Sequence, residues 1–180
     1  MQVTPTALPD VKLIEPRIFG DARGFFFESY NRRAFANVGI DAEFVQDNHS
    51  RSRRGVLRGL HYQIEHAQGK LVRVSAGAVF DVAVDLRRAS PTFGRHVGVE
   101  LSAENQKMLW IPAGFAHGFL VISEQADFLY KTTDYWYAEH ECTLLWNDAA
   151  LSIEWPLEEA PVMTVRDAAG TPLAAAATYS

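Results

Sequence analysis

Short apolar runs, separated at frequent intervals by glycine, proline and aspartate, make up most of the hydrophobic pattern of this chain. In the run from residue 79 to residue 86, Phe80, Val82, Val84 and Leu86 alternate with more polar positions and would share one face of a strand. Asp81, Ala83 and Asp85 would share the other face. The same reading predicts strands at residues 25–30, 44–49, 69–75, 79–86, 96–101, 107–111, 118–122 and 128–133.

One short helix is predicted among these strands, over residues 31–38, with Asn31 as its N-cap. Many short strands with turn signals between them are typical of a β-sandwich or barrel, and a jelly roll can enclose a ligand cavity. We therefore expect an all-β jelly-roll barrel with a few short helices. It should form a single domain over residues 1–180, with a loosely ordered, alanine-rich tail at residues 174–180.

Composition and charge narrow the possible functions. The 180 residues suit one domain, and the 48% hydrophobic and 22% charged fractions are ordinary for a globular protein. No apolar run approaches the ~18 residues needed to span a membrane, and the net charge of −5 argues against a nucleic-acid partner. The single cysteine, Cys142, excludes an internal disulfide, and the absence of a signal-like N-terminus fits a cytoplasmic location.

Three reactive side chains are candidates for chemistry, although each has a structural interpretation on its own. His61 is a possible general base near neutral pH, but a lone strand histidine is more often structural. Lys70 alone would usually be a surface charge, and Tyr130 alone a core or interface tyrosine. Arg51, Arg53 and Arg54 are expected to form a solvated face.

The motif Pro112-Ala-Gly-Phe-Ala-His117 resembles the second signature of the cupin superfamily. Metal-binding cupins carry two histidines spaced HxH in their first signature, whereas this chain has His61-Tyr-Gln63. Without the second histidine, three protein ligands for a catalytic metal are hard to assemble, so we expect no metal and no cofactor. A site formed by His61, His66 and His117 is the alternative left open.

Longer segments carry a more specific resemblance. Gln46-Asp-Asn-His-Ser50, Gly55-Val-Leu-Arg-Gly-Leu-His-Tyr-Gln63, Tyr130-Lys-Thr-Thr-Asp-Tyr135 and Leu145-Trp-Asn-Asp148 are similar, in order, to the dTDP-4-dehydrorhamnose 3,5-epimerase family. The resemblance extends from about residue 13 to about residue 173. It implies a metal-free enzyme that acts on a 4-keto-6-deoxyglucose linked to thymidine diphosphate and inverts carbons 3 and 5.

The resemblance also implies roles for individual residues. His61 would be the base that removes the proton beside the ketone, and Asp167 the carboxylate that orients it. Lys70 would stabilise the enolate oxygen. Tyr130, a phenol that is protonated at neutral pH, would return a proton to the opposite face of the sugar.

Ten further positions match substrate-binding residues of the family. Arg23 and Arg58 would hold the diphosphate as permanently charged forks, and Trp136 would stack on the thymine. The others are Glu28, Gln46, Asp47, Asn48, His117, Glu141 and Arg166. Three departures from the family pattern are Trp136 in place of a tyrosine, Arg166 in place of a lysine, and Ile64-Glu65 in place of a proline-containing pair.

The family forms homodimers, and the phenylalanine-rich stretch 17–30 is a candidate for exchange between subunits. Arg23 and Glu28 would then serve the neighbouring site. Three other functions remain as alternatives: an epimerase that inverts only carbon 3 or only carbon 5, a metal-dependent cupin oxygenase or isomerase, and a sugar-binding module without catalysis.

Overall fold

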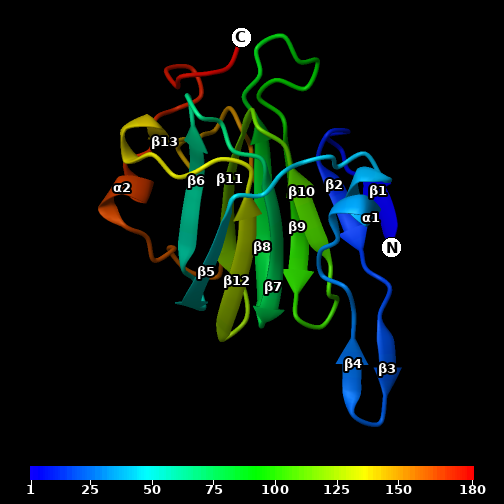
Figure 1. The fold of residues 1–180 in the computed structure, drawn as a ribbon. Coiled ribbons are helices and arrows are strands. Elements are labelled where there is room, and N and C mark those ends of the chain that lie inside the picture. Colours follow the sequence, from blue (N-terminus) through cyan, green and yellow to red (C-terminus); the bar gives the residue numbers. More distant parts are fainter.

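The computed structural model describes residues 1–180 and contains two facing antiparallel sheets that form a jelly-roll barrel, as expected. The first sheet has six strands, in the order β1 (Gln2–Pro5), β2 (Lys12–Glu15), β10 (Met108–Ile111), β7 (Lys70–Ala76), β12 (Gln125–Thr132) and β5 (Gln46–Arg53). The second has five, in the order β13 (Glu141–Thr143), β6 (Leu57–Gln63), β11 (Phe115–Val121), β8 (Ala78–Asp85) and β9 (His96–Ser102). A separate hairpin of β3 (Phe19–Asp21) and β4 (Gly24–Phe26) projects away from both sheets (Figure 1).

The inner faces of the two sheets share one hydrophobic core. Val72 and Phe128 of the six-stranded sheet pack in the same cluster as Leu101 and Phe119 of the five-stranded sheet. Strand β8 is buried on both faces, because Val82 and Val84 pack outward against a second cluster that includes Ala176 of the C-terminal segment. Asp81 and Asp85, on the inner face of β8, are therefore fully buried.

The strands predicted at 69–75, 79–86, 96–101 and 107–111 coincide with β7, β8, β9 and β10 to within a residue at each end. The strand predicted at 25–30 was wrong beyond Phe26, because residues 27–30 have no strand to pair with. Strands β1, β2, β3, β6 and β13 were not predicted.

The predicted helix is present as α1 (Arg32–Ala36), with the Asn31 side chain accepting the Ala34 N–H at 3.2 Å. A second helix, α2 (Val165–Ala168), and a 3-10 turn, η1 (Ala138–His140), complete the structure. None of these helices has the length and apolar character required to cross a membrane.

The C-terminal tail is docked on the barrel, so the expectation of a loosely ordered segment was wrong. The Tyr179 hydroxyl donates to the Gln63 carbonyl, and the Tyr62 hydroxyl donates to the Ala177 carbonyl at 2.7 Å. Tyr179 also exchanges backbone hydrogen bonds with Leu86 and Arg88. These two tyrosine hydrogen bonds hold the tail in place, although the small alanine side chains around them bury little apolar surface.

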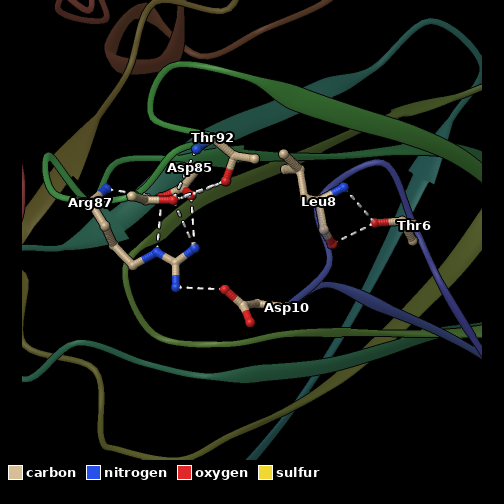
Figure 2. Close-up of polar contacts among 7 residues, drawn as sticks. Thr6, Leu8, Asp10, Asp85, Arg87 and Thr92 are labelled. Carbon is tan, nitrogen blue, oxygen red and sulfur yellow. Dashed lines mark hydrogen bonds and ion pairs between the residues drawn. The ribbon is translucent and has the colours of Figure 1, made fainter.

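An ion-paired cluster fastens the N-terminal segment to the barrel (Figure 2). Leu8 is buried in the main core, and Asp10, two residues further along, pairs with Arg87 at 2.8 Å. Arg87 also donates two hydrogen bonds to Asp85, which accepts a further one from Thr92 at 2.7 Å. Burial opposes the charge on Asp85, but the hydrogen bonds from Arg87 and its neighbours hold the pKa of that carboxyl well below its usual range.

Candidate active site

A cavity of about 750 Å³ opens between the two sheets and brings together most of the residues singled out from the sequence. Side chains from β5, β6, β7, β11, β12 and β13 line it, and the segment 162–167 closes one side. Eleven of the fourteen candidate residues line this cavity: Gln46, Asn48, Arg58, His61, Lys70, His117, Tyr130, Trp136, Glu141, Arg166 and Asp167.

His61 and Asp167 form a short hydrogen-bonded pair on the cavity wall. The His61 Nε2–H donates to the Asp167 Oδ1 at 2.6 Å, so the neutral ring presents its lone pair at Nδ1. Asp167 is buried at the start of α2, where its N–H donates to the Thr164 hydroxyl that caps the helix. Burial disfavours the carboxylate, but its interactions with His61, the Gly59 backbone and Thr164 together outweigh burial, so the pKa of Asp167 is lowered. This carboxylate can orient the imidazole and stabilise it after protonation.

A bulge between β6 and β11 sets the position of this pair. The strand register shifts between His117 and Phe119 of β11, opposite Arg58 and His61 of β6. Gly59 adopts a positive φ of 115°, and a Cβ there would lie 2.6 Å from the Gly118 Cα. The bulge therefore needs glycine, and it places Arg58 and His61 on the same cavity wall.

Lys70 lies at the beginning of β7, buried in the same cavity. Its ammonium donates to the His61 carbonyl at 3.3 Å. Burial lowers the pKa of Lys70 to about 8, against the opposing effect of the Glu141 and Asp81 carboxylates. A cation in such a site can stabilise an oxyanion that forms beside it.

Tyr130 approaches the cavity from β12, in the sheet opposite His61. Burial and the Glu141 charge raise the pKa of Tyr130, although the Arg58 charge opposes them. The phenol is therefore protonated at neutral pH and can act as a proton donor. A ligand between the sheets would meet a proton acceptor on one face and a proton donor on the other.

The cavity rim carries groups suited to a nucleotide diphosphate. Arg58 is exposed, and its Nε–H donates to Ser52 at 3.0 Å, which leaves the other guanidinium N–H groups free for an anion. The Gln46 amide donates to Asn48 at 3.0 Å and accepts the Trp136 backbone N–H. Trp136 itself is 55% exposed at the rim, where its ring is accessible for stacking.

Glu141 and Arg166 form an ion pair within the cavity. Arg166 also donates to the Glu141 backbone carbonyl at 3.0 Å, which ties α2 to β13. The positive charge at residue 166 is therefore held in place by a partner that is itself a candidate ligand.

Three candidate residues lie outside the cavity of their own chain. Arg23 is exposed at the tip of the β3–β4 hairpin, where it pairs with Asp21, and Glu28 accepts a hydrogen bond from Asn31. Asp47 points away from the cavity, because it alternates with the inward-facing Gln46 and Asn48, and it pairs with Lys131 at 2.8 Å.

The arginines expected on a solvated face are exposed and line no part of the cavity. Arg51 donates two hydrogen bonds to Asp127, on the adjacent strand β12. Arg54 lies 3.9 Å from Glu158, and Arg53 has no ion-pair partner.

Each histidine of the alternative metal site is bonded to a different carboxylate. His61 bonds Asp167, His117 bonds Asp81 at 2.9 Å, and His66 pairs with Asp134 at 3.2 Å. No three His, Cys, Asp or Glu side chains are arranged to hold a metal ion.

Gln63 stands where metal-binding cupins have their second histidine. Both the NH₂ group and the oxygen of its side-chain amide are hydrogen-bonded to the backbone. The amide donates to the carbonyls of His66 and Tyr135, and its oxygen accepts the Tyr137 N–H at 2.7 Å. Gln63 therefore holds the loop that carries Trp136.

Sequence reasoning missed two polar residues that support the site: Thr164, which lines the cavity, and Asp81, which bonds the cavity residue His117. The sequence analysis placed Asp81 on one face of an alternating strand and gave it no role. A carboxylate within an otherwise apolar segment was the signal that could have identified it. Thr164 caps a four-residue helix too short for any periodicity to reveal.

Comparison with known proteins supports one family. The sequence model of the dTDP-4-dehydrorhamnose 3,5-epimerase family matches residues 5–175. The dTDP-4-dehydrorhamnose 3,5-epimerase of Pseudomonas aeruginosa is 66% identical over 94% of each chain.

Solved structures agree with this assignment. A Legionella pneumophila 3,5-epimerase crystallised with dTDP-4-keto-L-rhamnose has a TM-score of 0.95 at 53% identity, over 97% of this chain and 93% of that one. A Streptomyces bikiniensis 3'-monoepimerase in complex with dTDP-quinovose has a TM-score of 0.89 at 33% identity, over 94% and 87% of the two chains. On the family match and these identities across nearly its whole length, the chain belongs to the dTDP-4-dehydrorhamnose 3,5-epimerase family.

Proposed function

We propose that this protein inverts carbons 3 and 5 of dTDP-4-dehydro-6-deoxy-D-glucose, giving dTDP-4-dehydro-L-rhamnose for dTDP-L-rhamnose biosynthesis. Both carbons flank the ketone at carbon 4, so their protons are acidic and one acid–base set can serve both. The observation that carries the proposal is the placement of His61 and Tyr130 on opposite sheets of one cavity. Inversion requires a proton to leave from one face of the ring and return to the other.

In the proposed reaction, Nδ1 of His61 removes the proton from the carbon beside the ketone. Asp167 fixes the ring through Nε2–H and stabilises the imidazolium that forms. The electron pair of the broken C–H bond moves into an enolate, whose oxygen Lys70 stabilises. Tyr130 then donates its phenolic proton to the opposite face of the same carbon, and the double bond returns to the ketone.

The nucleotide part of the substrate would lie at the cavity rim. Arg58 is the proposed ligand of the diphosphate, with Gln46, Asn48 and Trp136 around the base and sugar. Glu141, Arg166 and His117 would contact the rest of the substrate. Binding energy from these remote groups orients the sugar ring between base and acid.

We also propose a homodimer in which the β3–β4 hairpin reaches the partner subunit. Phe19, Phe25 and Phe26 on this hairpin are between 50% and 68% exposed, which is unusual for three neighbouring phenylalanines. Exchange would bury them and carry Arg23 and Glu28 to the neighbouring cavity. A cytoplasmic location stays a prediction from the sequence.

Mixed dimers test the exchange directly. Arg23→Ala and His61→Ala proteins, each of low activity alone, are refolded together. If Arg23 acts in the partner's site, the mixed dimer contains one complete site and activity returns. If Arg23 acts in its own subunit, or if light scattering shows a monomer, the exchange is wrong.

The single-site alternative is tested by its products. The family fold is shared with a 3'-monoepimerase, so the barrel alone does not decide how many carbons react. Proton NMR of the substrate in heavy water distinguishes the two enzymes, because deuterium enters at both carbons in one case and at a single carbon in the other.

A further inference from the structure

The segment 134–137, which we call the rim segment, carries Trp136 to the edge of the cavity and belongs to no strand or helix. Trp136 is 55% exposed and Tyr135 is 54% exposed, so neither aromatic side chain is fixed by its own burial. A segment outside the strand ladders is ordered only as far as other groups hold its backbone. The position of the Trp136 ring therefore depends on the groups that bond the rim segment.

Gln63 holds the rim segment on both sides of Trp136. Its NH₂ group donates to the Tyr135 carbonyl at 3.1 Å, and its oxygen accepts the Tyr137 N–H at 2.7 Å. The NH₂ group also donates to the His66 carbonyl at 2.8 Å. Gln63 is 3% exposed and lines no part of the cavity, so it does not contact a ligand there. A buried amide with backbone partners at both its nitrogen and its oxygen has one defined orientation.

Two other glutamines bond the same segment from the cavity side. Gln68 donates to the Asp134 carbonyl at 2.9 Å, and the Gln46 oxygen accepts the Trp136 N–H at 3.2 Å. Both of these glutamines line the cavity, so replacing either would also change the surface that a substrate meets. Gln63 is the glutamine whose effect on a ligand can pass only through the backbone of the rim segment.

We propose that Gln63 is a positioning residue for the nucleobase, holding the rim segment so that the Trp136 ring is in place before the nucleotide arrives. A ring that is already ordered binds a base more tightly, because less conformational freedom is lost on binding. The inference rests on the proposed function for the identity of the ligand. Gln63 takes no part in the proton transfers, since its side chain bonds only the backbone of other residues.

The first test compares the binding of dTDP and of pyrophosphate by calorimetry. Gln63→Met keeps the length of the side chain and removes its amide. We expect the affinity for dTDP to fall about three- to tenfold, which is at most what one aromatic stacking contact contributes. The affinity for pyrophosphate, which has no base, should stay within about twofold, because Arg58 keeps its own contact with Ser52.

A double-mutant cycle shows whether Gln63 acts through Trp136. Trp136→Ala alone should weaken dTDP binding about tenfold. When Trp136 is already replaced, Gln63→Met should change the affinity for dTDP by less than about twofold, because there is no ring left to position. If the two residues acted independently, the two losses would multiply.

Steady-state kinetics separate positioning of the base from catalysis. Gln63→Met should raise KM about three- to tenfold and keep kcat within about twofold, because it removes binding that is uniform through the reaction. Gln106→Met is the matched control, because the Gln106 amide also donates to a backbone carbonyl, that of Ala103. That bond lies in the turn between β9 and β10, outside the cavity, so the control should leave both affinities and both kinetic constants unchanged.

The unliganded protein provides a readout that needs no turnover. The chain has four tryptophans, so fluorotryptophan gives a resolvable fluorine NMR spectrum, and the Trp136→Ala protein identifies the Trp136 signal. In Gln63→Met we expect that signal to shift or broaden as the rim segment gains mobility. The signal of Trp155, whose indole N–H donates to the Trp146 carbonyl, should stay in place.

Three results would each overturn the inference. They are a dTDP affinity that falls no more than the pyrophosphate affinity, losses that multiply in the double variant, and a Trp136 signal that does not move. Gln63→Asn is the second variant if the methionine protein folds poorly, because its shorter amide cannot span the Tyr135 carbonyl and the Tyr137 N–H. A parent protein that binds dTDP but turns over no keto sugar would count against the proposed function and not against the positioning of Trp136.

Discussion

The hydrogen bond between His61 and Asp167 offers the sharpest single perturbation of the site. Asp167→Asn keeps the size of the side chain and the Thr164 cap of α2, but removes the negative charge that faces the imidazole. The amide can also turn its NH₂ group toward Nε2. The proton of the ring would then move to Nδ1, where the lone pair for catalysis is needed.

The size of the effect follows from the geometry of this bond. A hydrogen bond to a charged partner contributes about 1.5–3 kcal/mol, and the 2.6 Å bond to a buried carboxylate lies in the class to which that range applies. Since about 1.36 kcal/mol is tenfold in rate, loss of the charge alone lowers kcat by about 10- to 150-fold. The reversed tautomer removes the base and extends the loss toward about 10⁴-fold. We expect a fall in kcat of about 100-fold or more.

The assay follows deuterium incorporation and product formation by NMR, with dTDP affinity measured separately by calorimetry. The affinity should be unchanged, because Arg58 and the cavity rim are untouched. Glu65→Gln is the control, since Glu65 is an exposed carboxylate 3.8 Å from His140 and outside the cavity. A folded Asp167→Asn protein with kcat within threefold of the parent would show that His61 does not depend on this carboxylate.

Three further predictions concern the acid, the diphosphate and the stability of the barrel. Tyr130→Phe should lower the rate of inversion by about 10²- to 10⁴-fold but retain exchange of the substrate protons, which a comparison of deuterium incorporation with product formation measures. Equal losses of exchange and inversion would contradict the acid role. Arg58→Lys should raise KM with less effect on kcat in steady-state kinetics, because an ammonium cannot replace a bidentate guanidinium. A fall in kcat with little change in KM would instead indicate that Arg58 acts in the chemical step. Asp85→Asn should lower the free energy of unfolding by about 1.5–3 kcal/mol, as urea denaturation can measure. It removes the charged acceptor of Arg87, Ser90 and Thr92, and it leaves Arg87 paired only with the exposed Asp10. Folding lowers the pKa of Asp85, so its contribution is present above the unfolded pKa of about 3.9 and is lost as pH falls toward the folded value. The stability difference between parent and variant should therefore shrink below about pH 4, and a difference that grew there would contradict the sign.

The hydrophobic pattern predicted strands that have at least one strongly apolar, buried face. Strands β7, β8, β9 and β10 were found because each carries two or three valine, leucine or isoleucine residues at positions that fit a strand. Strand β6 was missed because Arg58, Gly59, His61 and Gln63 interrupt its apolar positions. Those residues serve the cavity and its loop, so the segment that matters most for the site is the one with the weakest strand signal.

The sequence predicted which residues form the site only because of the family resemblance, and not from the residue types themselves. His61, Lys70 and Tyr130 lie 69 positions apart at their extremes, and nothing in their spacing shows that one cavity receives them. The structure also separated residues that the sequence places side by side. Asp47 lies between two cavity residues and faces outward, because successive side chains of β5 point to opposite faces. The docked tail depends on tertiary contacts of Tyr179 that composition does not reveal.

The central claim is that one acid–base pair on opposite sheets exchanges and inverts the protons beside the ketone. The most direct test is proton NMR of dTDP-4-keto-6-deoxy-D-glucose with the protein in heavy water, run in parallel with His61→Ala. We expect deuterium at both carbon 3 and carbon 5 and conversion to the L-rhamno product, both abolished in His61→Ala. Deuterium at neither carbon, from a folded protein that binds dTDP, would contradict the account.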